Sequence, residues 1–143
     1  INQINLNKYA DEIIDIFDPK KQFIKHRLYR NHTTIDEVKN KVTSILTFRD
    51  LSKLGRDLNK TIIIDNIAEN FKLQQNNGLE IKTWTDDIRD VSLLDLTNIL
   101  KDLYTFRIKD IKDVVKKIND EVLSRVKKGM PNWYNDIDIS KYI

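Results

Sequence analysis

Three segments of the chain carry apolar residues at intervals of three and four positions, which is the pattern of an amphipathic helix. They are residues 6–17, 91–103 and 108–126. Gly129 and Pro131 follow the third segment and predict its end, because glycine and proline commonly stand just beyond a helix C-terminus. The apolar side of the second predicted helix comprises Leu93, Leu94, Leu96, Leu100 and Leu103.

Between the first two predicted helices the pattern favours strands. Residues 23–30 and 42–48 contain β-branched and aromatic residues, and each segment predicts a short strand. Residues 61–64 include three consecutive isoleucines, which predicts a strand of a parallel sheet that is buried on both faces. Residues 79–84 alternate apolar with polar positions and follow a turn at 76–78, which predicts a half-buried strand. The order of helix, four strands and two helices predicts an α/β fold.

Two further segments are less regular. Residues 50–58 predict a short helix or turn that Gly55 interrupts. Residues 130–143 form a polar and aromatic tail, and two alternatives stay open for it: the tail packs against the domain as an arm, or it stays loose.

Composition excludes several classes of protein. The 143 residues contain no cysteine, which removes disulfides, thiolate zinc sites and cysteine nucleophiles. No run approaches the roughly 18 apolar residues of a membrane span, so we expect no membrane span and a soluble compartment. The three glycines form no phosphate-binding loop motif. The 25 basic and 22 acidic residues are interleaved, which predicts only weak affinity for polyanions and no required nucleic acid.

Asp65 and Asn66 directly follow the predicted buried strand at residues 61–64. In open α/β sheets, ligands gather at the carboxyl ends of the strands, because helix N-termini and loop side chains converge there. On these residues alone, an acidic turn after a strand is the commoner explanation and a ligand site is the alternative.

Residues 48–66, Phe-Arg-Asp-Leu-Ser-Lys-Leu-Gly-Arg-Asp-Leu-Asn-Lys-Thr-Ile-Ile-Ile-Asp-Asn, resemble the signature of the NLI-interacting-factor-like, or small C-terminal-domain, protein phosphatases. The flanking residues 8–11, 27–30 and 77–87 also resemble this family, so the resemblance covers about residues 8–103. It implies a haloacid-dehalogenase fold, a Rossmann-like parallel sheet that is incomplete here at its N-terminal side and is followed by C-terminal helices. We expect residues 1–105 to be the C-terminal part of the phosphatase domain, and residues 106–143 a helical extension and tail.

The resemblance implies a mechanism whose nucleophile this chain lacks. Members of the family use an Asp-x-Asp-x-Thr motif, in which the first aspartate attacks phosphate and the second is the general acid and base. The matching spacing at Asp136 and Asp138 follows no predicted buried strand and has Ser140 in place of the threonine, so we interpret it as a coincidence. We therefore expect the nucleophile to lie outside this chain, and the chain alone to be inactive.

The resemblance also assigns four residues to the site. Arg49 occupies the position of the family's catalytic cation, Asp65 orients that cation, and Asn66 is the expected Mg²⁺ ligand. Arg30 is expected to bind the substrate. The alternatives are a surface role for Arg49 and a solvated arginine at position 30. The family usually continues Asn-Ser-Pro, whereas Ile67-Ala68 follows here, which leaves the geometry of this loop open.

Three hypotheses of function follow. The first is a Mg²⁺-dependent hydrolase of phosphoserine or phosphothreonine in a phosphorylated protein or peptide, located in the nucleus or cytoplasm. The second is a non-catalytic phosphatase-like binding protein, such as a mitochondrial import-receptor subunit. The missing nucleophile favours it, but that branch tends to lose the asparagine that Asn66 retains. The third is a basic helical interaction module at residues 106–128.

The first hypothesis makes two structural predictions. Asp65 and Asn66 should lie at the carboxyl end of the strand at residues 61–64, with Arg49 close enough to share a pocket. The family's nucleophile strand lies in the middle of the sheet. We therefore expect residues 62–64 to have an unpaired edge that a further segment, upstream or in a partner chain, completes.

Overall fold

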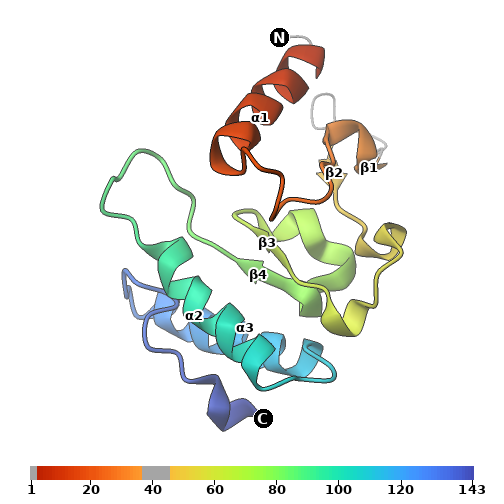
Figure 1. The fold of residues 1–143 in the computed structure, drawn as a ribbon. Coiled ribbons are helices and arrows are strands. Elements are labelled where there is room, and N and C mark those ends of the chain that lie inside the picture. The colour runs from red at the N-terminus through yellow and green to blue at the C-terminus, as the bar shows by residue number, and fades with distance from the viewer. Residues whose placement is uncertain (1–2, 37–45) are drawn as a thin grey trace. The chain divides into compact units, whose positions relative to one another are not determined.

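The structure, a computed structural model, describes residues 3–36 and 46–143 and has two compact units, residues 1–34 and 35–143 (Figure 1). The first unit contains α1 (Gln3–Phe17), which confirms the first predicted helix, and the short 3₁₀ helix η1 (Arg30–His32). Within the described residues, no helix is both long enough and apolar enough to cross a membrane.

The strand predicted at residues 23–30 is wrong, because these residues have no strand structure. Asp18, directly after α1, accepts hydrogen bonds from the backbone N–H groups of Gln22, Phe23 and Ile24 at 2.8–2.9 Å. These bonds lower the pKa of the Asp18 carboxyl. The backbone N–H groups at the start of this segment, which a strand would donate to a neighbouring strand, therefore donate to the Asp18 side chain.

The described residues form two small sheets. β1 (Thr34–Asp36) pairs with β2 (Leu46–Phe48), which confirms the strand predicted at residues 42–48 over 46–48, since 42–45 lie outside the described residues. β3 (Ile63–Asp65) pairs in parallel with β4 (Gly78–Glu80), and Asp65 lies opposite Glu80. A parallel pair followed by two helices is consistent with an incomplete α/β fold.

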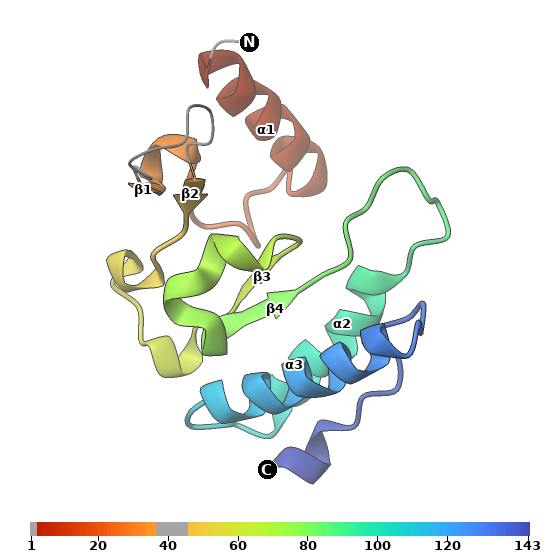
Figure 2. The ribbon, with the colours of Figure 1, turned by 180° about the vertical axis from the view of Figure 1, so that it is seen from behind.

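Helical segments lie on both sides of the β3–β4 pair (Figure 2). The kinked 3₁₀ helix η4 (Ala68–Asn77) brings the buried Phe71 ring against Gly78, where a Cβ atom would lie 2.1 Å from the ring. A glycine is therefore required at this position. The shorter 3₁₀ helices are η2 (Leu51–Leu54), η3 (Leu58–Lys60) and η5 (Ile139–Tyr142). Gly55 ends η2 in the left-handed conformation, as the predicted interruption requires.

The isoleucines of β3 are not buried on both faces, and that prediction is wrong. Ile64 is 37% exposed. Among the described residues β3 has a strand, β4, along one edge. The strand predicted at 79–84 is also shorter, because β3 turns away after Asp65 and the last bond of the pair runs from the Ile81 N–H to the Asp65 carbonyl at 3.0 Å.

The two predicted C-terminal helices are confirmed as α2 (Ser92–Thr105) and α3 (Lys112–Lys127), which pack below β3 and β4 in Figure 1. The apolar side predicted for α2 is wrong at Leu93 and Leu94, which are exposed, because Leu96, Ile99 and Leu103 face the core. Of the two alternatives for the tail, packing is observed, since Tyr134, Ile137 and Ile139 are buried in the same core. The proposed division between residues 105 and 106 stays a prediction.

Candidate functional site

Asp65 is a buried carboxylate at the carboxyl end of β3, and every oxygen of its side chain has a partner. Oδ1 accepts hydrogen bonds from the Ile67 backbone N–H at 3.0 Å and from Asn70 Nδ2 at 2.9 Å. Oδ2 forms an ion pair with Nη1 of Arg49. The Asp65 side chain is 7% exposed, so its charge requires this compensation.

Arg49 follows β2 and is held by η4 as well as by Asp65. Its backbone N–H donates to the Asn70 carbonyl at 2.7 Å. Farther along the loop, Gln74 of η4 accepts from the Leu51 N–H at 3.1 Å and donates to Asp50 at 3.0 Å. The Arg49 side chain is 48% exposed, so the guanidinium is anchored on one side and accessible on the other.

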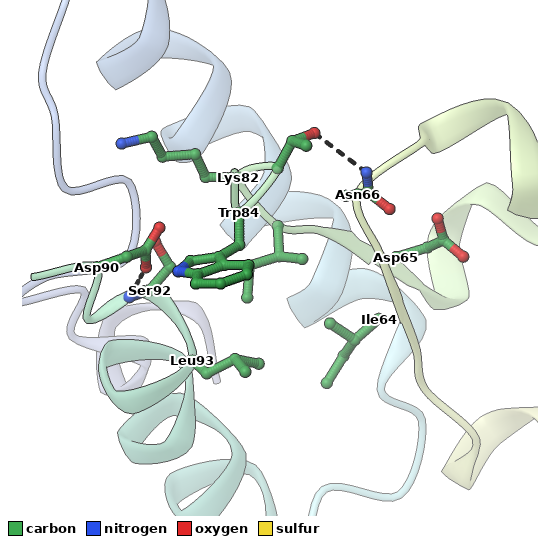
Figure 3. Close-up of a pocket in the computed structure, with 10 residues that line it drawn as sticks. Ile64, Asp65, Asn66, Lys82, Trp84, Asp90, Ser92 and Leu93 are labelled. Atoms are coloured by element: carbon green, nitrogen blue, oxygen red, sulfur yellow. Dashed lines mark hydrogen bonds between the residues drawn. The ribbon is translucent and has the colours of Figure 1, made fainter. Parts of the chain in front are cut away.

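Asn66 comes next in the chain and is exposed. Its Nδ2 donates to the Thr83 hydroxyl at 3.1 Å, and the amide oxygen points away from this bond (Figure 3). The Asp65 carboxylate points away from Trp84 and Leu93 in the same view. The side chains of these two consecutive residues therefore have partners on different sides of the strand end. Asp65 pairs with Arg49, and Asn66 bonds to Thr83 in the segment after β4.

A cavity of about 670 Å³ opens beside Asn66. Its apolar walls are Ile64, Ile81, Trp84 and Leu93, and its polar lining includes Lys82, Asp90 and Ser92. Trp84 donates from Nε1 to the Asp87 carbonyl at 3.0 Å, which orients the indole. Arg49 is not among the residues that line this cavity.

Lys82, Asp90 and Ser92 were not among the expected site residues. The Asp90 carboxylate accepts from the Ser92 N–H at 2.7 Å, just where α2 begins, and this bond lowers the pKa of Asp90. An aspartate directly before the helix predicted at residues 91–103 is a capping signal that sequence reasoning can detect. That Asp90 lines the same cavity as Asn66 depends on how α2 packs in the tertiary structure, which sequence reasoning does not show.

The structure brings together three of the four residues that the resemblance assigns, Arg49, Asp65 and Asn66, and their catalytic and metal-binding roles stay predictions. Arg30 belongs to η1 in the other compact unit, and its role in substrate binding also stays a prediction.

The oxygen atoms near Asn66 show which residues could ligate the expected Mg²⁺. Among residues 3–36 and 46–143, no group of three or more His, Asp or Glu side chains is placed to hold a metal ion. The Asp65 carboxylate is taken by its partners, whereas the Asn66 amide oxygen is oriented by the bond to Thr83 and accessible. These residues therefore fit one neutral oxygen ligand of an ion whose other ligands come from elsewhere.

The family model of NLI interacting factor-like phosphatases matches residues 4–114. The chain is 37% identical over 108 residues to CTD small phosphatase-like protein 3 of Caenorhabditis elegans, covering 76% of this chain and 35% of that protein. It is 34% identical to the human carboxy-terminal domain RNA polymerase II polypeptide A small phosphatase 2, covering 69% of this chain and 34% of that protein.

A second kind of relative also appears. The chain is 34% identical over 116 residues to mitochondrial import inner membrane translocase subunit TIM50 of Kluyveromyces lactis, covering 81% of this chain and 22% of that protein. The chain thus spans about a third or less of the length of these three relatives. With a family match over more than half of its residues, the chain belongs to the NLI interacting factor-like phosphatase family.

Proposed function

We propose that the protein containing this chain is a Mg²⁺-dependent phosphatase that removes phosphate from serine or threonine in a protein or peptide through an aspartyl-phosphate. The nucleophile comes from a segment that is not among these 143 residues. Membership of the family supports the reaction class. The observation that carries the proposal is the anchored Arg49–Asp65 pair beside the accessible Asn66 at the carboxyl end of β3.

Arg49 would offset the negative charge that gathers on the phosphoryl oxygens as the aspartate nucleophile attacks phosphorus. Asp65 holds the guanidinium and the Asn70 carbonyl holds the Arg49 backbone, so the cation needs little reorganisation during the reaction, which is how a preorganised cation lowers a barrier. Asp65 is therefore a positioning residue for Arg49. The Asn66 amide oxygen would ligate Mg²⁺, which neutralises charge on the phosphate when it is bound.

The nucleophile and the general acid are the two aspartates of the supplied segment. In the first step a bond forms between the first aspartate and phosphorus while the P–O bond to serine or threonine breaks, and the second aspartate protonates the leaving oxygen. In the second step the same residue takes a proton from water, the water oxygen bonds to phosphorus, and the bond between phosphorus and the first aspartate breaks, which releases inorganic phosphate.

The open side of β3 is where we place that segment. Ile64 is 37% exposed, Leu93 of α2 is 67% exposed, and both line the cavity beside Asn66. A further parallel strand along β3 would cover these side chains and bring its carboxyl end to the edge that carries Asp65 and Asn66.

The substitution Asn66→Ala in the complete protein tests the metal role. We expect Mg²⁺-dependent hydrolysis of an aryl phosphate to fall about tenfold to a hundredfold, with a higher half-saturating Mg²⁺ concentration. The free energy of unfolding should change by less than about 0.5 kcal/mol, because Asn66 is exposed. Asn98→Ala, at an exposed position of α2, is the matched control. Equal activity of Asn66→Ala and wild type at saturating Mg²⁺ refutes the metal role.

The second candidate is a non-catalytic binding protein, favoured by the similarity to TIM50 and by the absence of Asp-x-Asp-x-Thr from these residues. The two candidates imply different locations, nuclear or cytoplasmic for the phosphatase and mitochondrial for the binding protein.

Supplying an Asp-x-Asp-x-Thr segment upstream of Ile1 distinguishes them. A phosphatase should gain Mg²⁺-dependent hydrolysis, while residues 1–143 alone should aggregate or stay inactive. A monomeric, cooperatively folded chain of residues 1–143 that hydrolyses aryl phosphate unaided would show that the nucleophile is assigned wrongly. No hydrolysis with the segment supplied favours the binding protein.

A further inference from the structure

The family match ends at residue 114, yet the residues beyond it supply much of the core. α3 continues to Lys127, and the tail that follows is packed against the domain. Tyr134 is 2% exposed, and Ile137 and Ile139 are also buried. These side chains lie in one cluster with Leu79 of β4. The segment outside the family match is thus built into the fold beside β4.

Two side chains from this segment bind the backbone at the two ends of β4. Asn119 of α3 donates from Nδ2 to the Gly78 carbonyl at 2.8 Å, and the Tyr134 hydroxyl donates to the Glu80 carbonyl. Burial raises the pKa of Tyr134, with a contribution from the Glu80 carboxylate, so the phenol stays protonated and able to donate.

The bond to Glu80 meets the outer edge of the strand. The Ile81 N–H points toward β3, because it donates to the Asp65 carbonyl. In a trans peptide group the N–H and C=O point in opposite directions, so the Glu80 carbonyl faces away from β3. Tyr134 therefore satisfies an acceptor that an edge strand would otherwise leave open.

One peptide group thus links the tail to the candidate site. The peptide between Glu80 and Ile81 accepts from Tyr134 on one side and donates to Asp65 on the other. Asp65 in turn holds Arg49. Movement of this peptide would shift the backbone of the residue that anchors the guanidinium.

The far end of the tail is fastened to α3. Glu121 accepts from Lys141 Nζ at 2.6 Å and also from the Tyr142 hydroxyl. Lys117 Nζ donates to the Tyr142 carbonyl at 2.9 Å. These bonds join the tail to α3 and do not involve β4. Removing one of them is therefore a control for removing the bond from Tyr134 to β4.

We infer that Asn119 and Tyr134 brace the outer edge of β4, and that Tyr134 is a positioning residue for Asp65. The brace itself rests on geometry alone, and only its effect on catalysis rests on the proposed function. Asn119 and Tyr134 both lie outside the family match, which ends at residue 114.

The test compares Tyr134→Phe with Tyr142→Phe in the complete protein. Tyr134→Phe keeps the buried ring and removes only the bond to Glu80. Hydrogen exchange of the Ile81 amide should become about threefold to tenfold faster, while the Ile118 amide in α3 changes less than about twofold. Tyr142→Phe should leave the Ile81 amide unchanged. Unchanged exchange at Ile81 in Tyr134→Phe, or the same acceleration at Ile118, overturns the brace.

Activity provides a separate readout. If the wild-type protein is an active phosphatase, Tyr134→Phe should lower kcat about twofold to tenfold with little change in KM, and Tyr142→Phe should not. Faster exchange at Ile81 with unchanged kcat overturns the positioning role. An inactive wild type contradicts the proposed function, and hydrogen exchange still decides the brace. Should Tyr134→Phe fail to fold, Asn119→Ala removes the bond to Gly78 and should accelerate exchange in the same strand.

Discussion

The two edges of the β3–β4 pair differ in how they are covered. Along β4, Asn119 and Tyr134 bind the backbone, and the side chains behind them are buried in one core. Along β3, Ile64 is partly exposed, and no further strand is present among the described residues. The candidate site lies at the end of the less covered strand. The packed core and the candidate site therefore lie on different sides of the sheet, and substitutions should separate effects on stability from effects on the site.

The largest effect on stability is expected on the packed side. Ile118 of α3 is fully buried, so Ile118→Ala should lower the free energy of unfolding by about 3 kcal/mol, through lost burial and a cavity. Leu123→Ala, on the same helix at a position that is 52% exposed, should cost less than about 1 kcal/mol. Urea unfolding measures both. Equal losses would contradict the assignment of the buried face of α3.

A smaller effect on stability is expected at Asp65. Its buried charge lies in the candidate site, so it contributes to both stability and the site. Asp65→Asn keeps the shape but removes the partner of Arg49 and places an amide beside Asn70. The free energy of unfolding should fall by about 2 kcal/mol. Asp86→Asn, at an exposed position, is the control and should change it by less than about 0.5 kcal/mol. A loss as small as the control's would show that the Arg49–Asp65 pair contributes nothing net to stability.

The smallest effect is expected at Glu121, which bonds to Lys141 and Tyr142 of the tail, and this effect depends on pH. Burial opposes ionisation of Glu121, but hydrogen bonds from Lys141, Tyr142 and Arg125 outweigh it and lower its pKa from 4.5 to about 2. A carboxyl with a lowered folded-state pKa stabilises the protein above its unfolded pKa. This contribution should be present above about pH 4.5 and be lost as the pH falls toward 2.

Glu121→Gln should therefore cost about 1 kcal/mol at pH 7 and nearly nothing near pH 2. Chemical unfolding across this pH range measures the difference from wild type. Asp120→Asn, at the neighbouring exposed position of α3, should leave the pH dependence unchanged. If Glu121→Gln lowers the free energy of unfolding equally at both pH values, the ionised Glu121 carboxylate does not stabilise the tail.

Local patterns in the sequence predicted the elements that depend on local physics. Apolar periodicity of 3.6 residues is a property of the helix itself, so α1, α2 and α3 were found with small errors at their ends. Gly55 and Gly129 both have positive φ, as the predicted helix ends require. The strand predicted at residues 23–30 is absent because Asp18, outside the segment, accepts hydrogen bonds from backbone N–H groups at its start.

For the site, the sequence by itself determined that Asp65 and Asn66 are neighbours after an isoleucine-rich strand, and that a family motif includes Arg49. Only the tertiary structure decided that Asn70 binds both Arg49 and Asp65, that Leu93 is exposed, and that Tyr134 reaches the Glu80 carbonyl from 54 positions away. Spacing along a helix or strand constrains which residues share a face. It does not specify which partner a polar side chain meets across the fold, because that depends on how separate elements pack.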